Sequence, residues 1–509
     1  MESGPVEWPG RLERGLVRKV ASFPEAPCGE SLVNTILTVV NIGSSLGGLS
    51  PGRGIFAPGR LRVDASRSSF LHWPRPRCTP CRSLRVSLLP QPRSLIALLC
   101  ALAALALPTH ALGSERMYMG AAEDEGRNAD PAVAMAKMQL AKAAGFDTIR
   151  ITAIWEPGQI AVPAGQLAAL QAIAAAGDFL GIRVVTTVMN FGSRTTPLTA
   201  AARTQFARFA ADMVRRVPSI REYIVGNEPN LNRYWLPQFG PYGEDAAATA
   251  YVKLLARTYD AMKAADKGVF VIGGSVSPRG IDRPGTGRDT HSPTAFITDM
   301  GTAYRALKRN RPIMDGFSFH PYGESSSTPP TFAHAAGTSL GLADYDKLVG
   351  LLGSAFDGTK QLGSQLPIVY DEYGVDSQIP DGKRTFYGGK EPATTKPVSE
   401  GVQAAYYREA LELAACQPTV RGFLIFHVTD ETDYNRWQSG VYYADGTPKS
   451  SRAFVKQTMA EIRAGAVDCG EPPVAGSKEG WDLATPAEIA AAEKGSAIVG
   501  GWVFVDASG

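Results

Sequence analysis

The sequence EYIVGNEPN at residues 222–230 and the sequence IVYDEYG at residues 368–374 are the most informative about the fold. Each contains a short apolar run that leads to a glutamate, Glu228 in the first and Glu372 in the second. Short apolar runs bounded by glycine, proline and asparagine indicate buried β-strands. Two acidic side chains at such positions act together only if the fold brings the two strand ends to one face.

Comparable apolar runs alternate with longer helical patterns from Met117 onward. Phe206, Phe209 and Met213, for example, recur at i, i+3 and i+7 and so line one face of a predicted helix. This alternation is typical of parallel strands joined by crossover helices. The predicted strands are residues 117–122, 147–155, 183–190, 222–228, 269–275, 315–322, 367–374 and 421–429.

Eight such strands predict a (β/α)₈ barrel, the TIM barrel, within the α/β class. A doubly wound open sheet shows the same alternation but usually has fewer strands. Its nucleotide-binding form needs a G-x-G-x-x-G loop, and none follows the first predicted strand. A barrel brings the C-terminal ends of all strands to one face, where the active sites of this fold lie. We therefore expect Glu228 and Glu372 to face each other across one cleft.

A pair of carboxyl groups about 5 Å apart is what retaining cleavage of a glycosidic bond requires. One carboxyl group protonates the departing oxygen, and the other, ionised, attacks the anomeric carbon. Glu228 and Glu372 are the residues that a barrel would position for this chemistry. The proline after Glu228 removes a backbone donor and fixes φ, which helps to end the strand there.

The alternation of side chains along strands adds further residues to the predicted cleft. His320 and Tyr322 share one face of their strand, and Arg150 joins them if its own strand is oriented in the same way. Two of these have a second interpretation, His320 as a structural histidine and Arg150 as part of a buried ion pair. Asn227 and Glu228 are adjacent, so both reach the cleft only if regular pairing ends or bulges at this point.

Three tryptophans, Trp155, Trp235 and Trp437, lie near predicted strand ends or in the loops after them. There an aromatic face can stack on the C–H surface of a sugar, although packing within the loops accounts for the same positions. The acidic stretch at residues 430–435 suggests calcium, but a solvated loop is the simpler interpretation. The six histidines form no H-x-H or H-x-x-x-H pair, so we expect no metal and no cofactor.

On these residues the chain resembles the retaining glycoside hydrolases of the large (β/α)₈ clan, in which an Asn-Glu-Pro string ends strand four and a second Glu ends strand seven. The resemblance covers roughly residues 116–465. Within the clan it is most similar to the beta-xylosidase and alpha-iduronidase group, through GNEPNL at residues 226–231 followed by Trp235. The sequence FHPY at residues 319–322 agrees with the strand-six pattern of the clan.

The resemblance implies that Glu228 is the acid/base, Glu372 the nucleophile, and Asn227 a donor to the sugar hydroxyl next to the reacting carbon. The expected substrate is a β-linked oligosaccharide or polysaccharide, cleaved through a covalent glycosyl-enzyme intermediate. A non-catalytic carbohydrate-binding barrel is the alternative; such a protein would keep the aromatic residues and lose one carboxylate. Both carboxylates are present.

The same resemblance implies that Arg150, His320 and Tyr322 orient or hydrogen-bond the nucleophile. Two positions depart from the pattern of the group. Gly226 stands where the xylosidase-like sequences tend to have Trp, and Asp371 stands where Thr or Ser is common. These departures bear on the substrate more than on the chemistry.

The run SLIALLCALAALAL at residues 94–107 follows several arginines and precedes Ala-Leu-Gly at residues 111–113. It suits a signal peptide and is short of the ~20 residues that span a bilayer. We expect a signal peptide at residues 81–113 and a secreted protein, extracellular or periplasmic, with no stable membrane insertion after cleavage. Residues 1–80 are expected to be a disordered extension or the product of an upstream start codon.

The predicted catalytic domain covers residues 114–470, and a linker and tail follow at residues 471–509. Residues 1–93 carry 13 Lys and Arg against 6 Asp and Glu, so the rest of the chain is mildly acidic although the formal net charge is +3. We therefore expect a carbohydrate as the binding partner and no nucleic acid. Cys416 and Cys469 form a disulfide in an oxidising compartment or remain two buried thiols.

Overall fold

The computed structural model describes residues 116–470, 496–499 and 502–505. Within these residues eight parallel strands close into a barrel in which each strand pairs with the next along the chain and β8 pairs with β1. This confirms the predicted (β/α)₈ fold. The strands are β1 (Tyr118–Ala122), β2 (Thr148–Trp155), β3 (Arg183–Asn190), β4 (Glu222–Val225), β5 (Phe270–Val276), β6 (Gly316–Phe319), β7 (Ile368–Tyr373) and β8 (Val420–Phe426).

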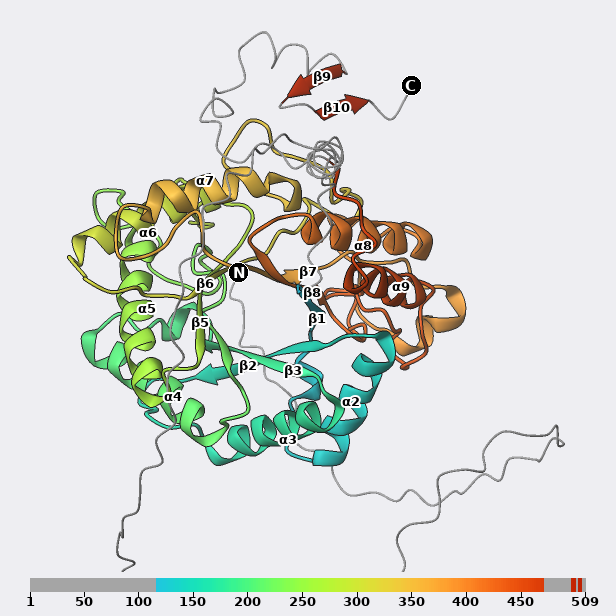
Figure 1. The fold of residues 1–509 in the computed structure, drawn as a ribbon, viewed down its shortest axis with the longest axis horizontal. Helices are drawn as coiled ribbons and strands as arrows, with labels where there is room; N and C mark the ends of the chain where they lie inside the picture. Colours follow the sequence, from blue (N-terminus) through green and yellow to red (C-terminus); the bar gives the residue numbers. More distant parts are fainter. Residues whose placement is uncertain (1–115, 471–495, 500–501, 506–509) are drawn as a thin grey trace, which may run out of the picture. The chain divides into compact units, whose positions relative to one another are not determined.

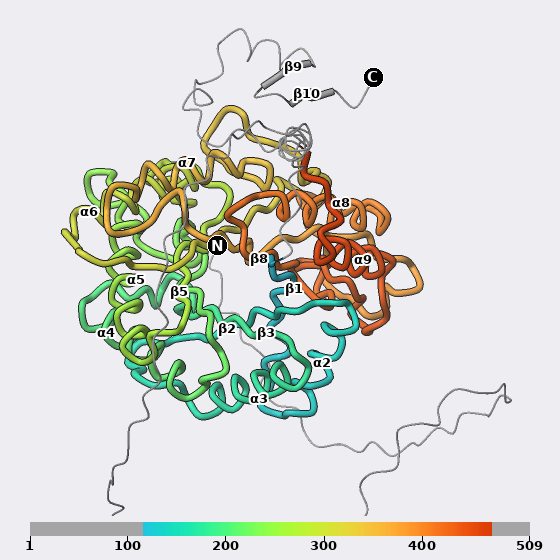
Figure 2. Tube along the Cα trace, viewed as in Figure 1, coloured from blue at the N-terminus to red at the C-terminus, as the bar shows by residue number. Residues whose placement is uncertain are grey.

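Helices form a ring around the strands (Figure 1). The chain passes once around this ring, so the colours of Figure 2 run in order from the first helix to the last, and α9 packs beside α2. The helices are α2 (Pro131–Ala144), α3 (Ala164–Leu180), α4 (Ala200–Arg216), α5 (Ala246–Ala265), α6 (Pro293–Ala306), α7 (Tyr345–Phe356), α8 (Glu400–Ala415) and α9 (Ser451–Arg463). Short 3₁₀ turns are η1 (Asp124–Gly126), η2 (Ser193–Thr195), η3 (Leu342–Asp344) and η4 (Asp381–Phe386).

Local sequence explains where the helices begin and end. Asp130, Thr199 and Ser292 each precede a helix and accept a hydrogen bond from a backbone N–H of its first turn. Gly145 ends α2 in the left-handed conformation, at φ 90°, which side chains rarely adopt. The predicted apolar face of α4 is confirmed, because its phenylalanines and Met213 are fully buried.

The core has two layers. A large cluster of apolar side chains fills the space between the strands and the helices. A smaller cluster lies inside the barrel and consists of inward-pointing residues from six strands, so the barrel is packed rather than open. These residues are Tyr118, Val185, Ile224, Ile272, Val369 and Leu424.

Three strands end three residues earlier than predicted. β4 ends at Val225 rather than at residue 228, β6 at Phe319 rather than at residue 322, and β8 at Phe426 rather than at residue 429. For β4 the reason is Gly226, which has φ 91° and packs so closely on Tyr251 that an added Cβ would lie 2.9 Å from its ring. Glu228 therefore follows the strand and escapes the strict alternation of side chains within it.

The structure joins Cys416, at the end of α8, to Cys469 by a disulfide. Within the expected tail, β9 (Ser496–Val499) and β10 (Trp502–Val505) pair as a two-stranded antiparallel sheet. The predictions for residues 1–113, and for the linker at residues 471–495, fall outside the described residues. No helix in the described part of the chain is both long enough and apolar enough to cross a membrane.

Candidate active site

Glu372 lies near the C-terminal end of β7, and its carboxylate contacts three donors. Arg150 Nη1 donates to Oε1 at 2.6 Å, and the Tyr322 hydroxyl donates to Oε2 at 3.0 Å. The Nδ1 atom of His320 is 3.4 Å from the same Oε2. Burial by itself would raise the pKa of Glu372, but the charges of His320 and Arg150 lower this pKa below its usual value. Glu372 is therefore ionised at neutral pH.

Glu228 follows β4 and reaches the same histidine. Its Oε1 atom lies 3.1 Å from Nδ1 of His320. Because one ring nitrogen contacts both carboxylates, the two contacting oxygens are no farther apart than the sum of the two contact distances. The side chains of Glu228 and Glu372 are 14% and 11% exposed, so solvent reaches both. The barrel thus brings together two glutamates that are remote in the sequence.

The backbone around Glu228 has unusual dihedral angles. Glu228 has φ 40° and Ser275 has φ 52°, values that residues other than glycine rarely adopt. The Glu228 N–H donates to the carbonyl of Ser275 at 2.8 Å. The pairing of β5 with β6 also shifts register between Gly274 and Val276. Strained positions of this kind concentrate at functional sites, and here they fix the direction in which the Glu228 side chain leaves the strand end.

His320 follows β6 directly and is fully buried. Its Nε2 atom lies 3.1 Å from Ser275 Oγ and 3.3 Å from Asp371 Oδ1, on the side opposite the two glutamates. Burial would lower the pKa of His320, but the charges of Glu372 and Asp371 raise it to about 10. The imidazole is therefore protonated at neutral pH, and each ring nitrogen carries a hydrogen toward an oxygen.

Asp371 belongs to this cluster although sequence reasoning did not assign it to the site. Its side chain is fully buried, and Oδ2 lies 3.4 Å from Arg150 Nη1, the atom that also contacts Glu372. Neighbouring residues of a regular strand point to opposite faces. Here the pairing of β7 with β8 shifts register between Tyr370 and Tyr373, which allows both acids to reach one guanidinium. The paired acids in the sequence IVYDEYG are the signal that could have indicated this.

Arg150 projects from β2 and connects several of these groups. Its Nε donates to Thr187 Oγ1 at 2.7 Å, and its Nη1 donates to the backbone carbonyl of Asp371 at 3.0 Å. Burial opposes its charge, but Glu372 and Asp371 raise the pKa of Arg150 above its usual value. The charged guanidinium is thus held in place and binds the acidic residues of β7.

Tyr322 connects the carboxylates to an aromatic surface. Its ring stacks on Trp437, with 4.9 Å between centroids and 27° between planes, and the edge of Phe426 packs against both rings. Burial and the charge of Glu372 raise the pKa of Tyr322, so its hydroxyl remains a donor. Trp437 is partly exposed. It is the predicted tryptophan that lies beside the carboxylate cluster.

Trp155 and Trp235, which were predicted to contact substrate or to pack within the loops, are buried by packing contacts. Trp155 is 0% exposed, packs its ring against Phe206, and donates its Nε1 hydrogen to the carbonyl of Gln159. Trp235 is 1% exposed and meets the edge of Tyr251. Both are large apolar side chains that belong to the main hydrophobic core.

Three further residues lie near Glu228. Asn227, predicted as a substrate donor, precedes it directly and is 9% exposed. Tyr234 was missed; burial is the main reason that its pKa is raised, and the charge of Glu228 contributes. Arg279 was also missed; its Nη1 donates to the carbonyl of Gly323 at 2.8 Å and so holds the segment after His320. Their positions depend on loops, for which the sequence offers no periodic pattern.

Metal ligation has no candidate among the described residues, since no group of three or more His, Cys, Asp or Glu is placed to hold an ion. The cluster described above consists instead of acids paired with Arg150 and His320. What it offers chemically is one ionised carboxylate that is held in place and a second, more exposed carboxylate nearby.

The fold is similar to that of solved glycoside hydrolases. One is a family 39 glycoside hydrolase from the gut symbiont Bacteroides cellulosilyticus WH2, with 19% identity, a TM-score of 0.50, and coverage of 69% of this chain and 64% of that chain. A calcium-binding mutant of Bacteroides uniformis beta-glucuronidase 2 matches at 15% identity and a TM-score of 0.42, over 69% of this chain and 34% of the other. A beta-galacturonidase from Eisenbergiella tayi matches at 15% identity and a TM-score of 0.40, over 69% of this chain and 51% of the other.

The chain spans less than two thirds of the length of these structures, and at such identities the similarity concerns the fold. Neither a protein-family model nor the sequence of a curated protein matches the chain.

Proposed function

We propose that this protein is a retaining glycoside hydrolase that cleaves O-glycosidic bonds in a β-linked oligosaccharide or polysaccharide. The observation that carries the proposal is that His320 Nδ1 contacts both carboxylates, Glu228 at 3.1 Å and Glu372 at 3.4 Å. Retaining enzymes separate the two carboxyl groups by about 5–5.5 Å and inverting enzymes by about 6.5–9.5 Å. The two contact distances mean that the oxygens are no farther apart than the lower end of the inverting range. They reach that separation only if the three atoms are collinear, and any bend at Nδ1 brings them closer together.

In the first step Glu228 donates its proton to the departing oxygen while a Glu372 oxygen attacks the anomeric carbon. The glycosidic C–O bond breaks, and a glycosyl ester forms at Glu372. In the second step Glu228, now a carboxylate, takes a proton from water as the water oxygen attacks the same carbon. Glu372 departs as a carboxylate, and Glu228 again holds a proton.

The charges around the site suit this division of roles. Asp371 and Glu372 are acids that contact Arg150, and His320 is the second cation of the cluster. Two cations balance two anions when Glu228 carries a proton. The charge of the cluster is thus compatible with one proton donor and one ionised nucleophile in the resting site.

Other side chains would act by orientation. Arg150 and Tyr322 hold the two oxygens of Glu372 and so aim the nucleophile. Trp437 would offer its partly exposed ring to the C–H face of the sugar, and Asn227 would donate to the hydroxyl next to the reacting carbon. Within the glycosidases we propose the beta-xylosidase and alpha-iduronidase group, on the strength of the sequence GNEPNL at residues 226–231.

We also propose that the protein is exported. The apolar run at residues 94–107 supports this, and so does the disulfide between Cys416 and Cys469, because disulfides persist mainly in oxidising compartments. Expression with the residues before Ser114 retained, followed by mass spectrometry of the protein from periplasm or medium, tests the proposal. A product that stays in the cytosol with these residues uncleaved would contradict export.

The catalytic proposal is tested by a screen of aryl β-glycosides and of plant and microbial polysaccharides, followed by Glu228→Ala. This variant should still form the glycosyl ester from substrates with good leaving groups, and azide should restore the second step, since azide needs no general base. Glu461→Ala, on the outer helix α9, is the matched control and should behave as wild type. Oligosaccharide binding without any turnover would indicate the carbohydrate-binding barrel instead.

A further inference from the structure

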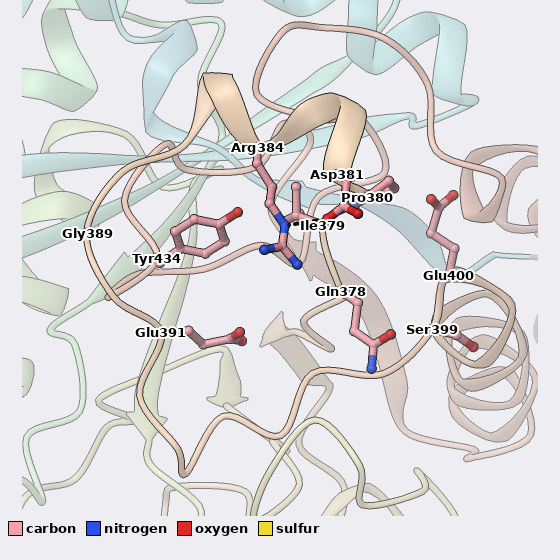
Figure 3. Close-up of a pocket in the computed structure, with 10 residues that line it drawn as sticks. All are labelled: Gln378, Ile379, Pro380, Asp381, Arg384, Gly389, Glu391, Ser399, Glu400 and Tyr434. Atoms are coloured by element: carbon pink, nitrogen blue, oxygen red, sulfur yellow. Dashed lines mark ion pairs between the residues drawn. The ribbon is translucent and has the colours of Figure 1, made fainter.

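A pocket of about 680 Å³ lies apart from the carboxylate cluster, and none of its lining residues belongs to that cluster. Its walls come from the loop between β7 and α8 and from the loop after β8. The side chains of Arg384, Glu391 and Tyr434 project into the same space, with Gln378 and Ser399 nearby (Figure 3). We call this site the outer pocket. Since both loops leave the C-terminal ends of strands, it lies on the same end of the barrel as Glu228 and Glu372.

The two loops that form the outer pocket are tied together by their backbones. Gly388 donates its N–H to the carbonyl of Thr432 at 2.8 Å and accepts from the N–H of Tyr434 at 2.8 Å. Tyr387 stacks at an angle on Tyr434, 5.4 Å between centroids, and its hydroxyl donates to Asp430 at 2.8 Å. The walls are therefore preformed, so a ligand would bind without first ordering them.

The lining has the chemistry of a site for a neutral, hydroxyl-rich ligand. Tyr434 offers a partly exposed ring, and Glu391 is a partly buried acceptor whose pKa is raised by burial alone. Arg384 offers donors, but Asp381 lies 3.0 Å from its Nε and offsets its charge. A free anion would be repelled by Glu391 and would find Arg384 already paired. A sugar would place a C–H face on the ring and its hydroxyls on the carboxylate and the guanidinium.

One short loop connects the outer pocket to the carboxylate cluster. Tyr434 lines the pocket, and Trp437, three residues later, stacks on Tyr322, which donates to Glu372. Three residues of chain span at most about 11 Å at ~3.6 Å per residue. A carbohydrate chain bound beside Trp437 would need to extend only a short way along this loop to reach Tyr434.

We propose that the outer pocket is a distal subsite, which binds a sugar unit of an oligosaccharide whose scissile bond lies between Glu228 and Glu372. This inference rests on the proposed function and adds to it that the enzyme acts on chains rather than on short glycosides. Binding energy gained at a distance from the scissile bond raises kcat/KM for substrates long enough to reach the pocket.

The test uses the full chain and two kinds of substrate, p-nitrophenyl β-glycosides and β-1,4-linked xylo- or cello-oligosaccharides of two to six units, according to the sugar that the aryl glycosides identify. In the wild type, kcat/KM should rise with chain length. Tyr434→Ala should lower kcat/KM for the longest oligosaccharides about tenfold, a loss on the scale of one aromatic contact, and leave the aryl glycosides within about twofold. Glu391→Gln should act in the same direction and more weakly.

Phe179→Ala is the matched control, because Phe179 is an exposed aromatic residue near the end of α3, at the opposite end of the barrel. This variant should have the same kcat/KM as the wild type for both kinds of substrate. An equal loss on aryl glycosides and oligosaccharides in the Tyr434 variant, or no dependence on chain length in the wild type, overturns the distal subsite while the proposed function stands. A wild type that hydrolyses no glycoside of either kind overturns both.

Discussion

The two ends of the barrel each hold a glutamate against arginine, and they differ in charge balance. At the N-terminal end, Glu222 accepts hydrogen bonds from Arg183 and Arg421, so one acid meets two cations. Both guanidiniums also lie over the ring of Tyr118. At the C-terminal end three acids share two cations, and both carboxylate oxygens of Asp371 have no hydrogen bond.

This difference indicates what each end contributes. The N-terminal cluster supplies two cations to one oxygen of its single acid, leaves Glu222 Oε2 without a hydrogen bond, and adopts ordinary backbone geometry, as expected where stability is the requirement. The C-terminal cluster holds an excess of acid and includes Glu228 and Ser275 at positive φ. A fold retains such a surplus and such strain where they serve a reaction. Variants at the two ends should therefore separate activity from stability.

The largest expected effect is on activity at the C-terminal end. Glu372→Gln removes the nucleophile and should lower kcat/KM for aryl glycosides by at least ~10⁴-fold, which corresponds to more than ~5 kcal/mol of transition-state stabilisation. The melting temperature should change little, because Arg150 still has an acidic partner, Asp371, whose Oδ2 lies 3.4 Å from Nη1. Residual activity above about a tenth of wild type would remove Glu372 from the role of nucleophile.

The second effect is on stability at high pH. The folded-state pKa of His320 is about 10, above the ordinary value of ~6.5, so its protonated form stabilises the fold. This contribution is fully present below pH 6.5 and is lost as the pH rises to 10. Urea unfolding should give a free energy of unfolding that falls by about 4 kcal/mol over this window.

His320→Gln is the control for this pH dependence, because it removes the titrating group and retains a polar side chain at the same position. Its free energy of unfolding should change less between pH 6.5 and 10 than that of the wild type. Parallel curves for the two proteins would show that His320 is not protonated in the folded state.

A third effect is expected at the N-terminal end, on stability alone. Glu222→Gln leaves Arg183 and Arg421 without their acid and should lower the free energy of unfolding by about 2 kcal/mol. We expect less than for a fully buried pair, because the two arginine side chains are 43% and 37% exposed. Turnover per folded molecule, measured well below the melting temperature, should equal that of wild type. A large loss of turnover would contradict the division between the two ends.

The last expected effect concerns one hydrogen bond at the C-terminal end. Tyr322→Phe removes the donor to Glu372 Oε2 and keeps the ring that stacks on Trp437. Hydrogen bonds to charged groups contribute about 1.5–3 kcal/mol, so kcat should fall about 10- to 100-fold with little change in KM. The acid limb of the pH profile should move to higher pH, because the lost donor helped to lower the pKa of Glu372. An unchanged acid limb would assign Tyr322 to packing alone.

Local sequence predicted much of the barrel and part of the site. The eight strands follow from apolar runs separated by helical patterns, and these patterns depend on residues that are close in the chain. Glu228 and Glu372 were identified because each follows such a run. The roles of Trp155 and Trp235 could not be predicted, because a tryptophan after a strand fits a cleft and a buried gap equally well.

Asp371 shows a different limit. Because Asp371 is adjacent to Glu372, the two side chains would point to opposite faces in a regular strand. The shifted pairing of β7 with β8 is what brings Asp371 to Arg150. Register depends on the partner strand, which is remote in the sequence. The outer pocket has the same origin, since its two loops meet through Gly388 and Tyr434 in the folded chain alone.

The alternation of strands and helices and the pair of glutamates at strand ends follow from the amino-acid sequence alone. The folded barrel was needed to show that β4 ends early at Gly226, which aromatic residues are buried, that Asp371 faces Arg150, and that His320 is protonated. The two groups of features differ in the range of the interactions on which they depend. Strand and helix patterns and turn residues act between neighbours in the chain, whereas burial, register and the mutual effect of charges on pKa depend on groups that meet only when the barrel closes.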